Sequence, residues 1–229
     1  MFDLAAQEVI DPRLGVRRGE TVLDIGCGGM PYVHSTHLAD VSLLDHSGRF
    51  GLPVPLRPRP VYECSVENMP FEDDQFDFVY CAHVLEHVSD PATACRELIR
   101  VGRRGYIECP RSWTEYVFSA PDHRWLVDFE GGTLIFREKL RQEEGDPLGL
   151  RFAIFAWLRD AEFKQHWDSR AMRALRTVEV HWSGTFDFLV VDRSQREASA
   201  GLPGRSLPPV LRSPRLRLER MTAPRVGAA

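Results

Sequence analysis

The chain has 229 residues, of which 43% are hydrophobic, and a formal net charge of −4 at pH 7. This length and composition favour one globular domain with a substantial core, and the acidic balance argues against a general nucleic-acid binder. No apolar run approaches the roughly 20 residues that a membrane-spanning helix needs, so we expect a cytoplasmic protein without membrane contact.

In the first half of the chain, short apolar runs alternate with turn residues. Four of these runs predict buried strands, at residues 21–25, 41–45, 76–81 and 105–109. The segment between the last two predicts a helix, because Asp90 can cap it, Pro91 suits its first position, and Gly102 or Gly105 can end it. Strand, helix and strand in succession predict a parallel sheet with right-handed crossovers.

The second half breaks this rhythm with an aromatic-rich insertion at about residues 111–140. The insertion predicts a hairpin, 124–129 and 133–137, around "EGG". Residues 150–166 have helical periodicity, and two alternating strands joined at "SGT" within 177–193 predict a second hairpin and thus a final antiparallel strand. We expect a domain over residues 1–193 and a disordered Pro/Arg-rich tail over 194–229.

The stretch "LDIGCGGMP" carries the first chemical signal. Gly26 and Gly28 fit the glycine-rich turn of nucleotide-binding proteins, but Pro31 stands at the third glycine position and Asp24 directly precedes the loop. A carboxylate there repels a phosphate and suits a ligand with an ammonium and a sulfonium group. Asp45 ends the expected second strand, where a carboxylate can accept both hydroxyl hydrogens of a ribose. This charge pattern favours S-adenosylmethionine over a dinucleotide.

Three motifs follow one another along the chain: "VLDIGCGG", then "SLLD", then "SVENMPFEDDQFDFVYCAHVLEHVSDPATACRELIRVGRRGYIECP". Together they resemble the class I S-adenosylmethionine-dependent methyltransferases over roughly residues 21–110. The resemblance implies an α/β fold, with a Rossmann-like seven-stranded, mostly parallel sheet, a final antiparallel strand, and helices on both faces.

The same resemblance implies which residues bind the cofactor. The methionine part would contact Asp24, the backbone of Gly26, Cys27, Gly28 and Gly29, and the segment Cys81 to His83; the ribose would contact Asp45; the adenine would contact His46, Ser65, Val66 and Glu67. Ser65 stands where family members commonly have Asp, so the adenine contact passes to Glu67 or to backbone groups. The stretch after Gly28 is too short for a full helix, and we expect a shortened first crossover with an extended turn at Pro31.

Methyl transfer is an in-line displacement, so the enzyme must align the reactants, exclude water and, for a hydroxyl or protonated amine, accept a proton. Two histidines that follow expected strands, His123 and His83, are the candidate catalytic bases. Trp113, Tyr116 and Trp125 are candidates to line an apolar acceptor pocket, or else form the core of the insertion.

The spacing of His83, Glu86 and His87 superficially suggests a metal site. Because "LEHV" resembles a stretch of metal-independent methyltransferases, we expect packing and capping roles there and no metal. His34 and His37 fit a surface loop better than a ligand pair. The five cysteines include no CxxC pair, which argues against a zinc site or a disulfide framework.

The function predicted from the sequence is transfer of a methyl group from S-adenosylmethionine to an O- or N-nucleophile of a small-molecule acceptor. Two alternatives stay open: a nucleic-acid or protein methyltransferase, and a non-catalytic scaffold that retains the fold. A nicotinamide dehydrogenase is disfavoured by Asp24 and Pro31.

Overall fold

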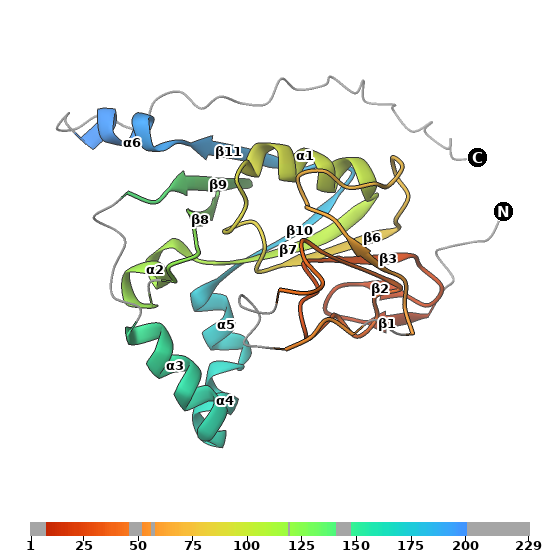
Figure 1. Cartoon of the computed structure of the whole chain (residues 1–229), viewed down its shortest axis with the longest axis horizontal. Helices are drawn as coiled ribbons and strands as arrows, with labels where there is room; N and C mark the ends of the chain where they lie inside the picture. The colour runs from red at the N-terminus through yellow and green to blue at the C-terminus, as the bar shows by residue number, and fades with distance from the viewer. Residues whose placement is uncertain (1–7, 46–51, 56–57, 119, 141–147, 201–229) are drawn as a thin grey trace, which may run out of the picture.

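The computed structural model describes residues 8–45, 52–55, 58–118, 120–140 and 148–200. Its centre is a six-stranded sheet (Figure 1) with the spatial order β10 (Thr177–Ser183), β7 (Arg104–Pro110), β6 (Phe78–Ala82), β3 (Val22–Ile25), β4 (His37–Asp40) and β5 (Val61–Glu63). The four neighbouring pairs from β7 to β5 are parallel, and β10 is antiparallel to β7. The predicted parallel sheet and its antiparallel last strand are therefore confirmed.

A second, three-stranded sheet is formed by β8 (Trp125–Glu130), β9 (Thr133–Glu138) and β11 (Asp187–Val191). The predicted hairpin in the insertion is confirmed, since β8 and β9 pair antiparallel. The second predicted hairpin is wrong, because β10 joins the central sheet whereas β11 pairs parallel with β9. The described part of the central sheet consequently has six strands and not seven. Burial explains the split: Leu189 and Val191 of β11 pack against Ile135 of β9.

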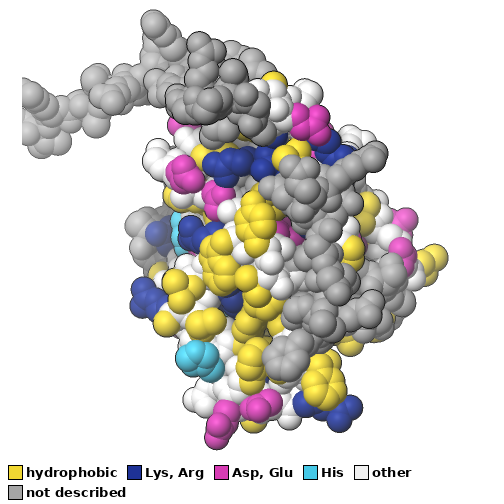
Figure 2. Space-filling model, turned by 90° about the vertical axis from the view of Figure 1, so that its left-hand side faces the viewer, with side chains coloured by type: hydrophobic (Ala, Val, Ile, Leu, Met, Phe, Trp, Pro, Cys, Tyr) yellow, Lys and Arg dark blue, Asp and Glu magenta, His cyan; other side chains and the backbone are white. Residues whose placement is uncertain are grey.

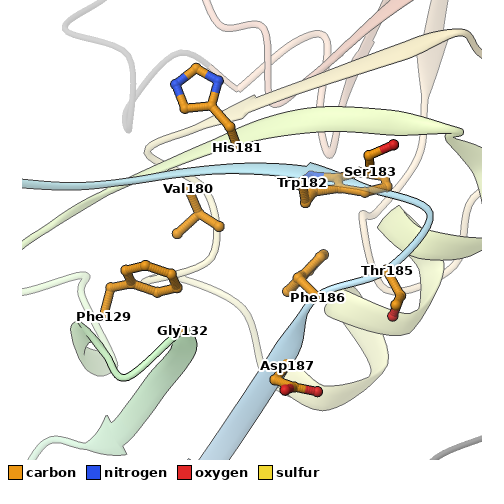
Figure 3. Close-up of a pocket in the computed structure, with 9 residues that line it drawn as sticks. All are labelled: Phe129, Gly132, Val180, His181, Trp182, Ser183, Thr185, Phe186 and Asp187. Carbon is orange, nitrogen blue, oxygen red and sulfur yellow. The ribbon is translucent and has the colours of Figure 1, made fainter.

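A cavity of about 350 Å³ lies where the two sheets diverge. Figure 3 shows Val180 and Trp182 of β10 facing Phe129 and Phe186 across it. Ser183 pairs with Arg104, the first residue of β7, so this cavity is at the amino ends of the parallel strands. Ligands of doubly wound sheets bind at the opposite, carboxyl ends, which places the functional site elsewhere.

Helix α1 (Pro91–Val101) matches its prediction. Asp90 caps it by accepting hydrogen bonds from the N–H groups of Ala92 and Thr93, and Ala94, Cys95, Leu98 and Val101 bury its apolar face in the core. Figure 1 shows α1 above the central sheet and α5 (Arg170–Arg176) below it.

The other elements lie at the edges of the fold. Strands β1 (Val9–Asp11) and β2 (Val16–Arg17) form a small antiparallel pair, and α2 (Ser112–Phe118) follows β7. The expected helix 150–166 is divided into α3 (Leu148–Arg159) and α4 (Ala161–Trp167), because Asp160 caps a new helix by accepting the Phe163 N–H. Helix α6 (Arg193–Ala200) occupies the start of the expected tail; residues 201–229 lie outside the described residues.

Candidate functional site

A pocket of about 790 Å³ opens at the carboxyl ends of the parallel strands. The chain segments that follow β3, β4, β5 and β6 line it, and Asp122 joins them from the segment before β8. This is the edge of a doubly wound sheet at which cofactors bind.

The loop after β3 forms one wall of this pocket with Gly26, Cys27, Gly28 and Gly29. Gly26 has a φ of 72° and Gly28 a φ of 54°, values that side-chain-bearing residues rarely adopt. A Cβ atom on Gly26 would also collide with Val84 from the segment after β6. Gly26 is therefore required for the close approach of these two segments.

Asp24 lies buried at the base of the same wall, where its Oδ2 accepts the Tyr32 N–H at 2.7 Å. Burial raises its pKa to about 7, although the Tyr32 hydrogen bond and the charge of Arg59 oppose the increase. Tyr32 reaches Asp24 because residues 26–36 contain no helix, which confirms the shortened crossover. A ligand with an ammonium group would compensate the buried carboxylate.

The acidic residue at the end of β4 is Asp40, and the predicted strand 41–45 is wrong. Val41 and Leu44 are 71% and 86% exposed, so this apolar run does not belong to the core. The strand lies earlier because Leu38 pairs with Asp24 in the parallel ladder. Asp45 still lines the pocket, but from the loop beyond the strand.

Asp40 itself connects two walls of the pocket. Its Oδ2 accepts the Gly28 N–H at 2.9 Å, and its Oδ1 accepts the Ser42 N–H at 3.3 Å. A carboxylate at this position of the second parallel strand is where a ribose is bound in such sheets. The sequence does contain a signal for Asp40: the apolar run "HLAD" ends in an acid and directly precedes the run 41–45.

The other predicted cofactor residues divide into three groups. Ser65, Val66 and Glu67 line the pocket as expected, and so does His83. The side chain of Cys81 packs in the main core instead, because β6 alternates its faces, and Ala82 lines the pocket in its place. His46 lies outside the described residues.

His83 takes an unusual conformation between two buried carboxylates. Its φ is 58°, its Nε2 lies 3.1 Å from Glu108 Oε1, and its Nδ1 lies 3.4 Å from Glu86 Oε1. Partial desolvation of the ring would lower its pKa, but the Glu108 and Glu86 carboxylates outweigh it and raise the pKa to about 9, although 47% of the side chain is exposed. A histidine that holds its proton at neutral pH is a poor general base, so the geometry argues against that role for His83.

Glu108 is held from several sides. Besides His83, it accepts hydrogen bonds from the Tyr106 hydroxyl and from Arg173 Nη1, the latter at 2.7 Å. Burial favours its neutral form, yet these partners lower its pKa to about 2. Glu108 is therefore a permanent anion that fixes His83 in the pocket wall.

The second predicted base, His123, belongs to a buried network in the insertion. Its Nδ1 lies 2.6 Å from Glu115 Oε1, and Lys139 Nζ donates to Glu115 Oε2 at 2.9 Å. The His123 ring meets the His87 ring edge-on, with centroids 4.6 Å apart, and His87 lines the pocket. The two histidines are 36 positions apart, and no local sequence pattern predicts this contact.

Of the two alternatives for the aromatic residues of the insertion, the structure supports a core position for Trp125 and neither alternative for Trp113 and Tyr116. Trp125 is buried, and its Nε1 donates to the Val88 carbonyl at 2.8 Å, which supports the turn before α1. Trp113 and Tyr116 lie exposed on α2. Figure 2 shows hydrophobic side chains gathered on the side of the molecule to which α2 and α3 belong.

Comparison with known proteins identifies the class. Residues 23–107 match the family described as a methyltransferase domain. The ubiquinone biosynthesis O-methyltransferase of Pseudomonas paraeruginosa (strain DSM 24068 / PA7) is 33% identical over 170 residues, which cover 66% of this chain and 67% of that protein. Its counterpart in Pseudomonas aeruginosa (strain UCBPP-PA14) is 32% identical with the same coverage. The chain belongs to the class I S-adenosylmethionine-dependent methyltransferases, and its cofactor is S-adenosylmethionine.

Comparison with solved structures gives partial matches. The YcgJ protein of Bacillus subtilis has a TM-score of 0.32 and 26% identity, covering 41% of this chain and 45% of that one. An Anabaena variabilis putative methyltransferase from an antibiotic biosynthesis pathway has a TM-score of 0.37 and 18% identity, covering 44% and 42%. With TM-scores this low, the family assignment depends on the sequence relatives.

None of the helices in the described ranges has the length and apolar character that crossing a bilayer requires.

Proposed function

We propose that this methyltransferase acts on a hydroxyl oxygen of a small-molecule acceptor, bound in the part of the pocket between His83 and His87. The observation that carries the proposal is that the glycine loop and a histidine-bearing wall face the same space in one pocket of about 790 Å³. A volume of this size accommodates ligands of metabolite size. The ubiquinone biosynthesis enzymes named above, which are O-methyltransferases, support an oxygen acceptor.

The described residues fit the cofactor at both of its ends. Asp24 is a buried carboxylate whose second oxygen can accept from the methionine ammonium group, which would stabilise its ionised form. Asp40 supplies a carboxylate to the ribose hydroxyls, and residues 65–67 would border the adenine. S-adenosylmethionine supplies the electrophilic methyl carbon when it is bound.

Beyond the cofactor, the chain's own residues must align the acceptor and receive its proton. His83 is held by Glu108 as a cation, so the proton must leave toward another group. His87 lies in the same wall, and its Nδ1 can donate to the Asp122 carbonyl at 3.2 Å, which leaves Nε2 as its lone-pair atom. The acceptor hydroxyl would therefore lie on the His87 side of the pocket.

The experiment is a turnover assay with S-adenosylmethionine and paired acceptors that differ only in a hydroxyl, an amine or a methyl ether. Formation of S-adenosylhomocysteine with hydroxyl acceptors, lost in Asp24→Asn, is the expected result. Turnover with amines alone, or with RNA or protein but no small molecule, would contradict the proposal. Tight cofactor binding without turnover of any small-molecule, RNA or protein acceptor would favour the non-catalytic scaffold.

A further inference from the structure

A cluster of three ligand-type side chains adjoins the pocket on its His87 side. Glu86, His87 and His123 each offer one metal-binding atom, and these atoms all lie within 4.8 Å of one another. His87 lines the pocket itself, as does Asp122 next to His123. The cluster is thus positioned beside the space assigned to the acceptor.

Glu86 is the unusual member of this cluster. Its side chain is only 1% exposed, and its printed ion-pair contacts are long: Oε1 lies 3.4 Å from His83 Nδ1 and 4.0 Å from His87 Nε2. Neither carboxylate oxygen has a partner with good hydrogen-bond geometry among the described residues. Buried polar groups in folded proteins nearly always have partners, because desolvation of an unpartnered charge is costly. The long contacts with His83 and His87 leave the Glu86 carboxylate able to bind a closer cationic partner.

The two histidines are oriented as metal ligands are. His87 Nδ1 lies 3.2 Å from the Asp122 carbonyl oxygen, and His123 Nδ1 lies 2.6 Å from Glu115 Oε1, with Glu115 fixed in turn by Lys139. Each Nδ1 can donate to its outer acceptor, which leaves each Nε2 with a free lone pair. A metal-binding histidine typically donates its other ring N–H to a carboxylate or a backbone carbonyl in this way.

Backbone hydrogen bonds bring the two halves of the cluster together. The N–H groups of Arg124 and Trp125 donate to the Glu86 carbonyl at 2.7 and 3.2 Å, so the segment with His123 is fixed against the turn with Glu86 and His87. His87 Nε2 lies 4.0 Å from Glu86 Oε1. Ligand atoms around zinc are about 3.4 Å apart for bonds of roughly 2.1 Å, so the cluster would close by roughly 1 Å around an ion.

We propose that Glu86, His87 and His123 bind a divalent transition-metal ion, best matched by Zn²⁺, whose open coordination position takes the acceptor's hydroxyl oxygen. Two imidazoles and one carboxylate are a donor set of catalytic zinc sites, which keep a position open for water or substrate. This proposal deepens the proposed function and depends on it.

The chemistry follows from the ion's charge. Because the lone pair of His87 Nε2 would bind the ion, it would not accept the hydroxyl proton; coordination of the hydroxyl oxygen would favour loss of that proton to solvent, as it does for zinc-bound water. The oxygen then attacks the methyl carbon, a carbon–oxygen bond forms as the carbon–sulfur bond breaks, and the bonding electron pair leaves with sulfur. The products are the methyl ether and neutral S-adenosylhomocysteine.

The competing explanation is that a protonated histidine, and not a metal ion, compensates the negative charge of Glu86. His83 Nδ1 lies 3.4 Å from Glu86 Oε1, and a protonated His83 would neutralise part of its charge. Under that explanation the cluster binds no metal, whereas under the proposal the ion makes direct bonds to Glu86. Direct metal binding distinguishes the two.

The test is calorimetric titration of the chelator-treated full chain with Zn²⁺, accompanied by Co²⁺ absorption spectra. We expect one ion per chain, and a loss of affinity of at least about tenfold in Glu86→Gln and in His123→Asn. His166→Asn is the matched control, because His166 lies exposed on α4. No stoichiometric binding by the wild type, or equal binding by all variants, overturns the proposal.

S-adenosylhomocysteine binding, measured on the same samples, separates this proposal from the proposed function. Retained cofactor affinity in Glu86→Gln and His123→Asn shows that the variants are folded, so that lost Zn²⁺ binding reports on the site. Hydroxyl methylation that persists without Zn²⁺ binding would overturn the metal proposal alone. Zn²⁺ binding without methylation of any hydroxyl acceptor would support the metal site and overturn the proposed oxygen acceptor.

Discussion

Replacing Asp40 by asparagine tests which acidic residue binds the ribose. Asparagine keeps a side-chain oxygen that can accept the Gly28 N–H, now held by Asp40 Oδ2 at 2.9 Å, so the glycine loop should keep its shape. What the variant loses is the negative charge. Asp45→Asn is the matched control, because Asp45 lines the same pocket from beyond the end of β4.

The magnitude follows from the bonds that change. A hydrogen bond to a charged group contributes about 1.5–3 kcal/mol, compared with about 1 kcal/mol for a neutral one. Asp40 can accept from the ribose hydroxyls, and the weakening of one or two such bonds should raise the dissociation constant by roughly 10- to 100-fold. For Asp45→Asn we expect less than about threefold.

Calorimetric titration with S-adenosylhomocysteine at pH 8 measures both constants, and melting curves check that both variants fold. The reasoning would be refuted if Asp45→Asn weakened binding and Asp40→Asn did not. That result would restore the assignment made from the sequence and would mean that the loop after β4 rearranges around the cofactor.

Three further predictions concern single residues. Because Asp24 has a pKa of about 7 and binds an ammonium group as the anion, S-adenosylhomocysteine affinity measured by calorimetry should fall about tenfold per pH unit below pH 7, and Asp24→Asn should remove this dependence. The folded-state pKa of His83, about 9, exceeds its unfolded value of about 6.5, so its stabilising contribution is complete below pH 6.5 and is lost as the pH rises through 9. In urea unfolding, His83→Gln should therefore lower the free energy of unfolding more at pH 6 than at pH 9.5. An equal loss at both pH values would count against the ion pairs of His83 with Glu86 and Glu108. A Cβ on Gly105 would lie 2.8 Å from the Trp182 ring and closer still to the Val79 carbonyl, so Gly105→Ala should lower the free energy of unfolding by about 1–3 kcal/mol, and an unchanged urea midpoint would show that the sheet adapts.

The parts of the fold predicted from the sequence are those with local causes. Strand β3 is a continuous apolar run followed by glycines, and α1 has Asp90 and Pro91 at its start, so both are defined by their own residues. The pairing partners of β10 and β11 are not local. Their shared alternation is equally suited to a hairpin or to two different sheets, and only burial against β7 and β9 decides between these.

The same distinction applies to the site. Asp24 and the glycines were found because their spacing is a local requirement of the strand and turn. Asp40 was missed because two apolar runs, each ending in an acid, compete for one strand position, and the register with β3 selects the earlier run. The contact between His87 and His123 depends on how the insertion folds back on the turn before α1, which no local pattern encodes. The cytoplasmic location and the disordered tail stay predictions.

The most direct test of the account is a crystal structure of the chain with S-adenosylhomocysteine. We expect the cofactor in the pocket of about 790 Å³, with its ammonium group on Asp24, its ribose hydroxyls on Asp40, and its sulfur facing the wall that bears His83 and His87. A cofactor bound elsewhere, or one whose ribose contacts Asp45 and not Asp40, would contradict it.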